Sequence, residues 1–209
     1  ATLACANELI EAGLIRELGL SNYSAVETER CLQICQENGW AAPTVYQGIY
    51  NAVNRGVEDE LLPILRAARP RIRFRAYSPL AGGLLSQPHR RERLPPKRVA
   101  DNPFYFSDAC LDANAALVRA SDDAGCASLL DANFSWLLHH SALSADDGIV
   151  LGASSTAQLR QNLRACAASK PLPAALVDVC GGGWERCRET AYPYWRLYSR
   201  DKPGALTHC

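Results

Sequence analysis

The chain has 209 residues, of which 48% are hydrophobic and 21% charged, and its 22 basic and 22 acidic side chains leave a formal net charge of zero. This composition is typical of globular chains, and it provides no overall attraction to nucleic acid or to an acidic membrane surface. The apolar stretches, such as 148–153 and 174–177, are far shorter than the roughly 18 to 20 residues of a membrane span. We therefore expect neither a nucleic-acid nor a membrane partner.

Helices and short strands alternate in the first part of the sequence. Amphipathic stripes predict the helices, a Ser-rich turn at 21–24 supplies a helix cap, and β-branched or aromatic runs predict the strands. In chain order, the predicted elements are a helix over 3–11, a strand over 14–20, a helix over 26–39, a strand over 44–47, a helix over 57–68 and a strand over 72–77.

A break follows the third strand, because Pro79 and the Gly82-Gly83 pair do not allow it to continue. The polar, Arg- and Pro-rich segment 86–106 is too long for an ordinary connection, so we interpret it as a variable functional loop or a flexible lid. The remaining elements are predicted as helices over 108–123 and 127–140, a strand over 149–152, a helix over 155–167, and a last helix over 172–190 that is broken at 181–183, where three glycines disfavour helix.

Four βα units of this kind predict an α/β fold with a parallel sheet covered on both faces. A doubly wound sheet would normally carry a glycine-rich phosphate loop after its first strand, and neither GxGxxG nor GxxxxGK[ST] occurs. A β/α barrel fits better, but a full barrel needs eight strands in roughly 250 residues. With about four strands and no Met anywhere, we expect a single partial barrel domain that is a fragment.

Small and hydroxyl residues follow the last predicted strand at the start of a helix. Ser154 and Ser155 can donate to a phosphate at this helix end, although an ordinary serine cap explains them equally well. Gln158, Gln161 and Asn162 share one face of the helix, where they could meet an adenine or simply face solvent.

Amide and aromatic groups end the other strands. Ser21, Asn22 and Gln47 are suited to a carboxamide ligand such as nicotinamide, and turn chemistry is the alternative for Asn22. Tyr77 could stack on a flat ring or pack on the core. No carboxylate pair or Ser/His/Asp set can be assembled from the strand ends, so the sequence identifies no general acid.

Nine cysteines are scattered along the chain, without any CxxC pair. We interpret them as small buried apolar residues of a reducing compartment, rather than as redox groups or metal ligands. A cytoplasmic location and no metal site follow from this interpretation.

Four ordered motifs together resemble the aldo-keto reductase family, and most closely its aflatoxin aldehyde reductase subfamily. They are Gly19-Leu20-Ser21-Asn22-Tyr23, the segment 43–51 (PTVYQGIYN), the segment 77–85 (YSPLAGGLL) and Leu151-Gly152-Ala153-Ser154-Ser155. The resemblance implies that the chain is the C-terminal half of a (β/α)8 TIM barrel, with a long variable loop at 86–106 and a C-terminal tail at 197–209.

The resemblance also implies that the chain binds NADPH. Ser21, Asn22 and Gln47 match the groups that hold the nicotinamide carboxamide, and Tyr77 matches the residue that stacks on the nicotinamide ring. The residues of the loop over the pyrophosphate include Ser78, Pro79, Leu80, Gly82 and Gly83. The element that holds the 2′-phosphate and adenine comprises Ser154, Ser155, Gln158, Gln161 and Asn162.

Two arginines resemble further ligand-binding positions of the family. Arg98 is similar to an additional cofactor-binding arginine, although its neighbours align poorly. Arg196 is similar to a terminal arginine on the substrate side.

The family reaction is hydride transfer from NADPH to a small aldehyde or ketone, with a Tyr that donates a proton and a Lys, Asp and His that support it. These four residues lie on the first four strands of the family's barrel, so none is expected in a chain that begins before the fifth. The alternatives are a catalytically inactive nucleotide-sensing or partner-binding module, or a truncated non-functional product. A homodimer stays open.

Overall fold

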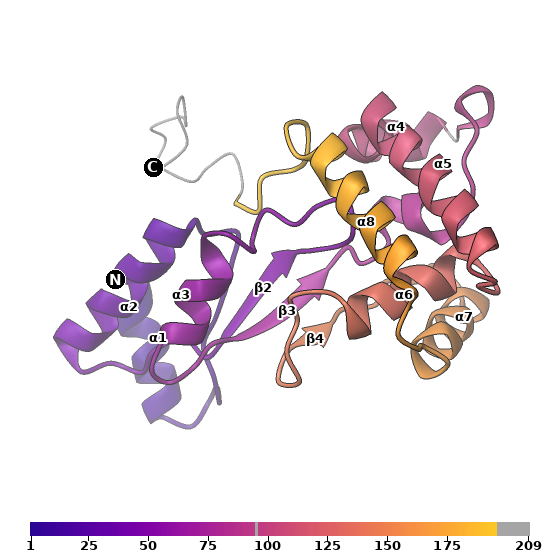
Figure 1. The fold of residues 1–209 in the computed structure, drawn as a ribbon. Helices are drawn as coiled ribbons and strands as arrows, with labels where there is room; N and C mark the ends of the chain where they lie inside the picture. The colour runs from indigo at the N-terminus through magenta and orange to yellow at the C-terminus, as the bar shows by residue number, and fades with distance from the viewer. Residues whose placement is uncertain (95, 196–209) are drawn as a thin grey trace.

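The computed structural model describes residues 1–94 and 96–195 (Figure 1). The first elements are α1 (Thr2–Glu11), β1 (Gly19–Ser21), α2 (Ala25–Asn38), β2 (Val45–Ile49), α3 (Leu61–Ala67) and β3 (Arg73–Tyr77). The segment after β3 contains the 3₁₀ turns η1 (Ala81–Ser86), η2 (Arg91–Arg93) and η3 (Pro103–Phe106), and the short helix α4 (Pro96–Asp101). The last elements are α5 (Asp108–Asp123), α6 (Leu129–His139), β4 (Gly148–Ile149), α7 (Thr156–Ala167) and α8 (Ala174–Cys187).

The four strands form one parallel sheet in the order β1-β2-β3-β4, which is also their order in the chain. A doubly wound sheet reverses its strand order at a switch point, whereas sequential order is that of a barrel wall. The predicted α/β class and parallel sheet are confirmed. In the described ranges, no helix is long and apolar enough to cross a bilayer.

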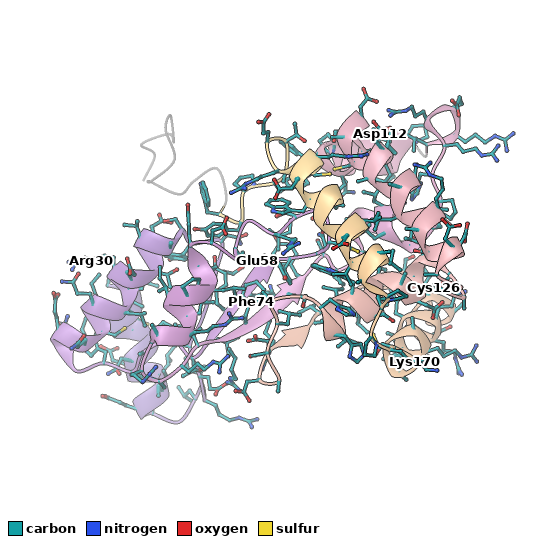
Figure 2. All side chains as sticks on the ribbon, viewed as in Figure 1. Arg30, Glu58, Phe74, Asp112, Cys126 and Lys170 are labelled. Atoms are coloured by element: carbon teal, nitrogen blue, oxygen red, sulfur yellow. The ribbon has the colours of Figure 1, made fainter. Side chains whose placement is uncertain are left out.

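The two faces of the sheet differ, which corrects the expectation that both are covered. Tyr46 and Phe74 are buried on one face, with their rings stacked 6.0 Å apart, and Phe74 lies at the centre of the sheet in Figure 2. Gln47 and Arg75, which alternate with them, are exposed and half-buried on the other face. Successive side chains of a strand point to opposite faces, and the described helices cover only one of them.

Serine caps begin four of the helices, and the predicted starts of these helices lie within two residues of the observed ones. Ser24 and Glu27 form a reciprocal capping box on α2, and the side chains of Ser107, Ser128 and Ser155 accept from backbone amides of α5, α6 and α7. A serine side chain at this position satisfies an amide that the helix leaves unpaired. The predicted helices over 108–123 and to residue 167 end where the structure ends them.

The first predicted strand is wrong over 14–18. The amide N–H groups of Leu14 and Ile15 donate to the carbonyl oxygen of Leu9, so these residues continue the end of α1, and Leu14 is 72% exposed. Only Gly19–Ser21 pairs with β2. The last strand is also shorter than predicted, and α3 begins at Leu61 because residues 57–60 form turns.

The segment 86–106, predicted as a variable functional loop or a lid, contains the short helical elements η2, α4 and η3. Its last residues, Tyr105 and Phe106, are buried in the core. These aromatic side chains anchor the end of the segment against the body of the domain.

The predicted break at 181–183 is also wrong, because α8 runs through these glycines without interruption. Helix α8 packs along α5 (Figure 1). A Cβ atom placed on Gly183 would lie 3.6 Å from the Cβ of Ala113, whereas one on Gly181 or Gly182 would meet nothing within 4 Å. The packing of Gly183 against α5 offsets the free energy that glycine residues cost in the interior of a helix.

This packing predicts opposite effects for two neighbouring glycines. Gly182→Ala should raise the free energy of unfolding by about 0.5–1 kcal/mol, because the new methyl group enters open space and the unfolded chain loses entropy. Gly183→Leu should lower it by about 1–3 kcal/mol, because the side chain overpacks the contact with Ala113. Urea unfolding measures both, and equal stability of the two variants would contradict the packing.

Candidate functional site

A cavity of about 520 Å³ opens where the chain leaves β3 and β4. Its walls come from the segment after β3, the residues between β4 and α7, and one face of α7, with Leu130 contributed by α6. The lining residues are Tyr77, Ser78, Pro79, Leu80, Gly82, Gly83, Ser86, Gln87, Leu130, Val150, Gly152, Ala153, Ser154, Gln158, Gln161 and Asn162. A volume of this size suits a small organic ligand, and it lies at the carboxyl end of the strands, where β/α folds bind ligands.

The segment after β3 has an unusual backbone. Ser78 and Ala81 adopt left-handed φ angles of 55° and 48°, and Gly82 and Gly83 follow at 62° and 97°. A Cβ atom on Gly82 would lie 2.9 Å from the side chain of Asn102, so both the φ angle and the space require glycine there. Strained non-glycine residues of this kind cluster at ligand sites, because surrounding contacts must hold them.

Three buried asparagines, Asn51, Asn114 and Asn133, supply such contacts. Asn51 Nδ2 donates to the carbonyl of Ser78 at 3.0 Å, and Asn133 Nδ2 donates to that of Pro79 at 3.1 Å. Asn114 Nδ2 donates to the carbonyls of two further residues of the segment, Leu84 at 2.7 Å and Gln87 at 3.1 Å. The segment is therefore held by side chains from three places, which are α5, α6 and the residues that follow β2.

Asn51 also connects this segment to η3. Its Nδ2 donates to the hydroxyl of Tyr105 at 3.1 Å. Burial raises the pKa of Tyr105, so its phenol stays neutral and serves as a structural hydrogen-bond partner.

The opposite wall of the cavity is the start of α7. Ser155 caps the helix, and both the backbone N–H and the hydroxyl of Ser154 donate to Gln158 Oε1, at 2.9 and 2.8 Å. Two donors therefore converge on one oxygen at the positive end of a helix dipole. An anionic oxygen could take the place of this amide oxygen, because backbone N–H groups at a helix start favour negative charge.

The described lining residues include no Asp, Glu, Lys, Arg or His. No carboxylate of the lining repels an anion, and the donors are neutral hydroxyl, amide and backbone groups. Across the described part of the chain, no group of three or more His, Cys, Asp or Glu could hold a metal ion.

Most of the residues predicted for a cofactor line this cavity together. They are Tyr77, Ser78, Pro79, Leu80, Gly82, Gly83, Ser154, Gln158, Gln161 and Asn162. Asn162 is buried and its Nδ2 lies 3.4 Å from the carbonyl of Gly152, while Gln161 is exposed. Ser155 does not line the cavity, because its hydroxyl caps α7 at the backbone N–H of Gln158.

The three residues predicted to hold the nicotinamide carboxamide, Ser21, Asn22 and Gln47, do not line the cavity. They lie at the same edge of the sheet as the cavity. Ser21 is paired in register with Gln47, and Ile49 of the same strand is paired with Tyr77. Asn22 Nδ2 donates to Ser21 Oγ at 3.0 Å, and the left-handed φ of 63° at Asn22 supports the turn interpretation. Because β1, β2 and β3 are neighbours in this order, the polar residues at the ends of β1 and β2 lie along the edge of the sheet that leads to Tyr77 and the cavity.

Two predicted arginines cannot be placed. Arg98 belongs to α4, but its side chain is outside the description, and Arg196 lies outside the described residues.

The sequence prediction missed several lining residues, among them Ser86, Gln87, Leu130 and Val150. Ser86 and Gln87 come three and four residues after Gly83, so their place close to the glycine pair was a usable signal. Leu130 carries none, because a leucine on a helix is ordinarily a core residue.

A substitution of Asn114 tests whether its hydrogen bonds hold the segment that forms one wall of the cavity. Asn114→Ala should lower the free energy of unfolding by about 2–4 kcal/mol, because the Leu84 and Gln87 carbonyls and the His89 N–H, which donates to Asn114 Oδ1, lose their partner. The matched control is Ser121→Ala on the same helix, whose hydroxyl donates only to the carbonyl of Leu117 at the described positions and should cost less than about 1 kcal/mol. Hydrogen exchange should accelerate over 78–90 in the first variant only, and unchanged exchange there would contradict the role of Asn114.

Comparison with known proteins identifies relatives over most of the chain. The model of the aldo/keto reductase family matches residues 1–178. Aldo-keto reductase family 7 member A3 of Homo sapiens is 37% identical, with 93% of this chain and 63% of that protein covered. Aflatoxin B1 aldehyde reductase member 4 of Homo sapiens is 38% identical over 88% of this chain and 59% of the relative, and member 2 of Rattus norvegicus is 37% identical over 93% and 57%.

The chain thus spans about three fifths of the length of these curated relatives. Its parallel sheet with sequential strand order agrees with the barrel that the resemblance implies. The family match and the identities lead to one conclusion: the chain belongs to the aldo/keto reductase family.

Proposed function

We propose that the chain is the cofactor-binding C-terminal half of a TIM-barrel reductase that uses NADPH to reduce small aldehydes or ketones. The observation that carries this proposal is the pair of Ser154 donors, which converge at the start of α7 on the wall of the cavity after β3. The family membership and the names of the relatives support reduction of a carbonyl compound.

The cavity has the donors that an extended dinucleotide requires. Ser154 and the start of α7 would take the 2′-phosphate when Gln158 turns away, and Gln161 and Asn162 lie one turn further along, where an adenine would reach them. Gly82 and Gly83 would allow the pyrophosphate to approach the backbone, because no side chain projects from them.

The nicotinamide end would continue along the polar edge of the sheet. Tyr77 would stack on the ring, and Ser21, Asn22 and Gln47 would hydrogen-bond the carboxamide, which presents one acceptor and two donor hydrogens. This assignment fits the register that brings β1, β2 and β3 to one edge.

The bound cofactor would supply the hydride, and this chain would hold and orient it. Transfer to a carbonyl also requires a proton donor whose pKa is tuned by neighbours. The described lining of the cavity offers Tyr77 without an adjacent Lys, His or carboxylate, so we propose that the acid and its partners belong to the additional length that the relatives have.

The lack of such an acid among the described lining residues favours a second candidate, a nucleotide-sensing module that binds NADPH without turnover. The described cysteines are all free thiols, which supports a reducing, cytoplasmic compartment for either function. A homodimer is compatible with both candidates.

Binding of the 2′-phosphate is tested by comparing two nucleotides. Ser154→Ala should weaken NADPH binding about 10-fold, because a hydrogen bond to a charged group is lost, and should leave NADH binding unchanged. Thr156→Ala, one position into α7 and outside the cavity lining, is the control and should affect neither nucleotide. Fluorescence titration measures both affinities, and an equal loss for NADPH and NADH would overturn the phosphate assignment.

Turnover gives a separate test. We expect the 209-residue chain to bind NADPH without oxidising it in the presence of a small aromatic aldehyde, because none of the described lining residues is a proton donor with a Lys, His or carboxylate beside it. The absorbance of NADPH at the nicotinamide band follows the reaction. Turnover above the protein-free rate would contradict the proposal that this chain binds the cofactor but does not supply the acid.

A further inference from the structure

Two buried cysteines meet at the most extensive helix contact of the domain. Cys110 lies in the first turn of α5, Cys187 is the last residue of α8, and their sulfur atoms are 3.3 Å apart. They are 77 positions apart in the chain, and their exposed fractions are 1% and 0%. The scattered cysteines of the sequence give no sign of this proximity.

The surroundings of the pair activate one sulfur. The hydrogen bond with Cys187 lowers the pKa of Cys110, against the effect of burial, and the Ser107 hydroxyl adds to the lowering. The position of Cys110 at a helix start acts in the same direction, because the helix dipole favours a thiolate. A thiolate beside a second thiol is the arrangement of a nucleophilic and a resolving cysteine.

We propose that Cys110 and Cys187 are a redox modification site, which a hydroperoxide converts into a disulfide that ties α5 to α8. The Cys110 thiolate attacks one peroxide oxygen, the O–O bond breaks and water leaves after protonation, which gives a sulfenic acid at Cys110. The Cys187 sulfur then attacks the Cys110 sulfur, forms the S–S bond and displaces the second oxygen as water. Overall, two thiols and one hydrogen peroxide give one disulfide and two waters.

The geometry allows this closure with little movement. The sulfur atoms must approach by little more than 1 Å to reach a bond of about 2.05 Å. Both cysteines lie at helix ends, which open locally more readily than helix centres and would admit a molecule as small as hydrogen peroxide.

The 209-residue chain, treated with hydrogen peroxide and then alkylated, provides the test. Mass spectrometry should recover the tryptic peptide 99–119 joined to a peptide that contains Cys187, with two hydrogens lost. Because the bond closes a long loop, the melting temperature should rise by about 5–15 °C and return on reduction. Separately alkylated Cys110 and Cys187, or overoxidation of Cys110 without the link, would overturn the proposal.

Two variants separate the pair from the other thiols. Cys187→Ser should stop the reaction at the Cys110 sulfenic acid, which a dimedone probe traps, while Cys180→Ser should form the link as the unmodified chain does. Cys180 is the matched control because it is buried on the same helix. A disulfide that forms through Cys180 instead, or a Cys187→Ser variant without trapped sulfenic acid, would contradict the assignment. If a variant fails to fold, the peptide map of the unmodified chain still tests whether Cys110 and Cys187 are joined.

Discussion

The hydrogen bonds from Asn51, Asn114 and Asn133 to the backbone carbonyls after β3 are the contacts on which the cavity depends. Each asparagine comes from a different part of the chain, and each amide is buried where water cannot replace it. A buried carbonyl that loses its donor pays the full cost of desolvation, so these bonds make the left-handed backbone at Ser78 and Ala81 the favourable conformation. The shape of one wall is therefore set by residues that do not line the cavity.

The sheet supplies the second constraint. Parallel pairing in sequential order brings the carboxyl ends of all the strands to one edge, and the register aligns Ser21 with Gln47 and Ile49 with Tyr77. Alternation of side chains then separates an aromatic face, with Tyr46 and Phe74, from a polar face with Gln47 and Arg75. In the described chain, helices pack only on the aromatic face, which agrees with a barrel wall, because the helices of a barrel cover only its outside.

Much of this arrangement could be predicted from the sequence, because local signals were strong. Serine caps marked the helix starts, and the glycines and Pro79 marked the end of β3. The predicted break at 181–183 failed because a tertiary contact decided the outcome: Gly183 packs on Ala113. The strand predicted over 14–18 failed for a local reason, because the amides of Leu14 and Ile15 donate to the carbonyl of Leu9 at the end of α1.

The residues that form the cavity also differ in whether a local sequence signal marks them. Residues in short motifs next to strand ends, such as Ser154 and Tyr77, could be identified from the sequence. Leu130 of α6 and the supporting Asn114 of α5 could not, because a helical residue gives no local sign of the distant segment that it contacts. The proximity of Cys110 and Cys187 depends in the same way on the packing of α5 against α8.

In the proposed function, the cavity between the segment after β3 and the start of α7 holds NADPH. Hydrogen exchange of the chain with and without NADPH tests this binding site directly, because amides that a ligand covers exchange more slowly. Bound NADPH should protect 78–87 and 152–162, with smaller protection at 21–22 and 47. Protection elsewhere, or none at saturating NADPH, would contradict it.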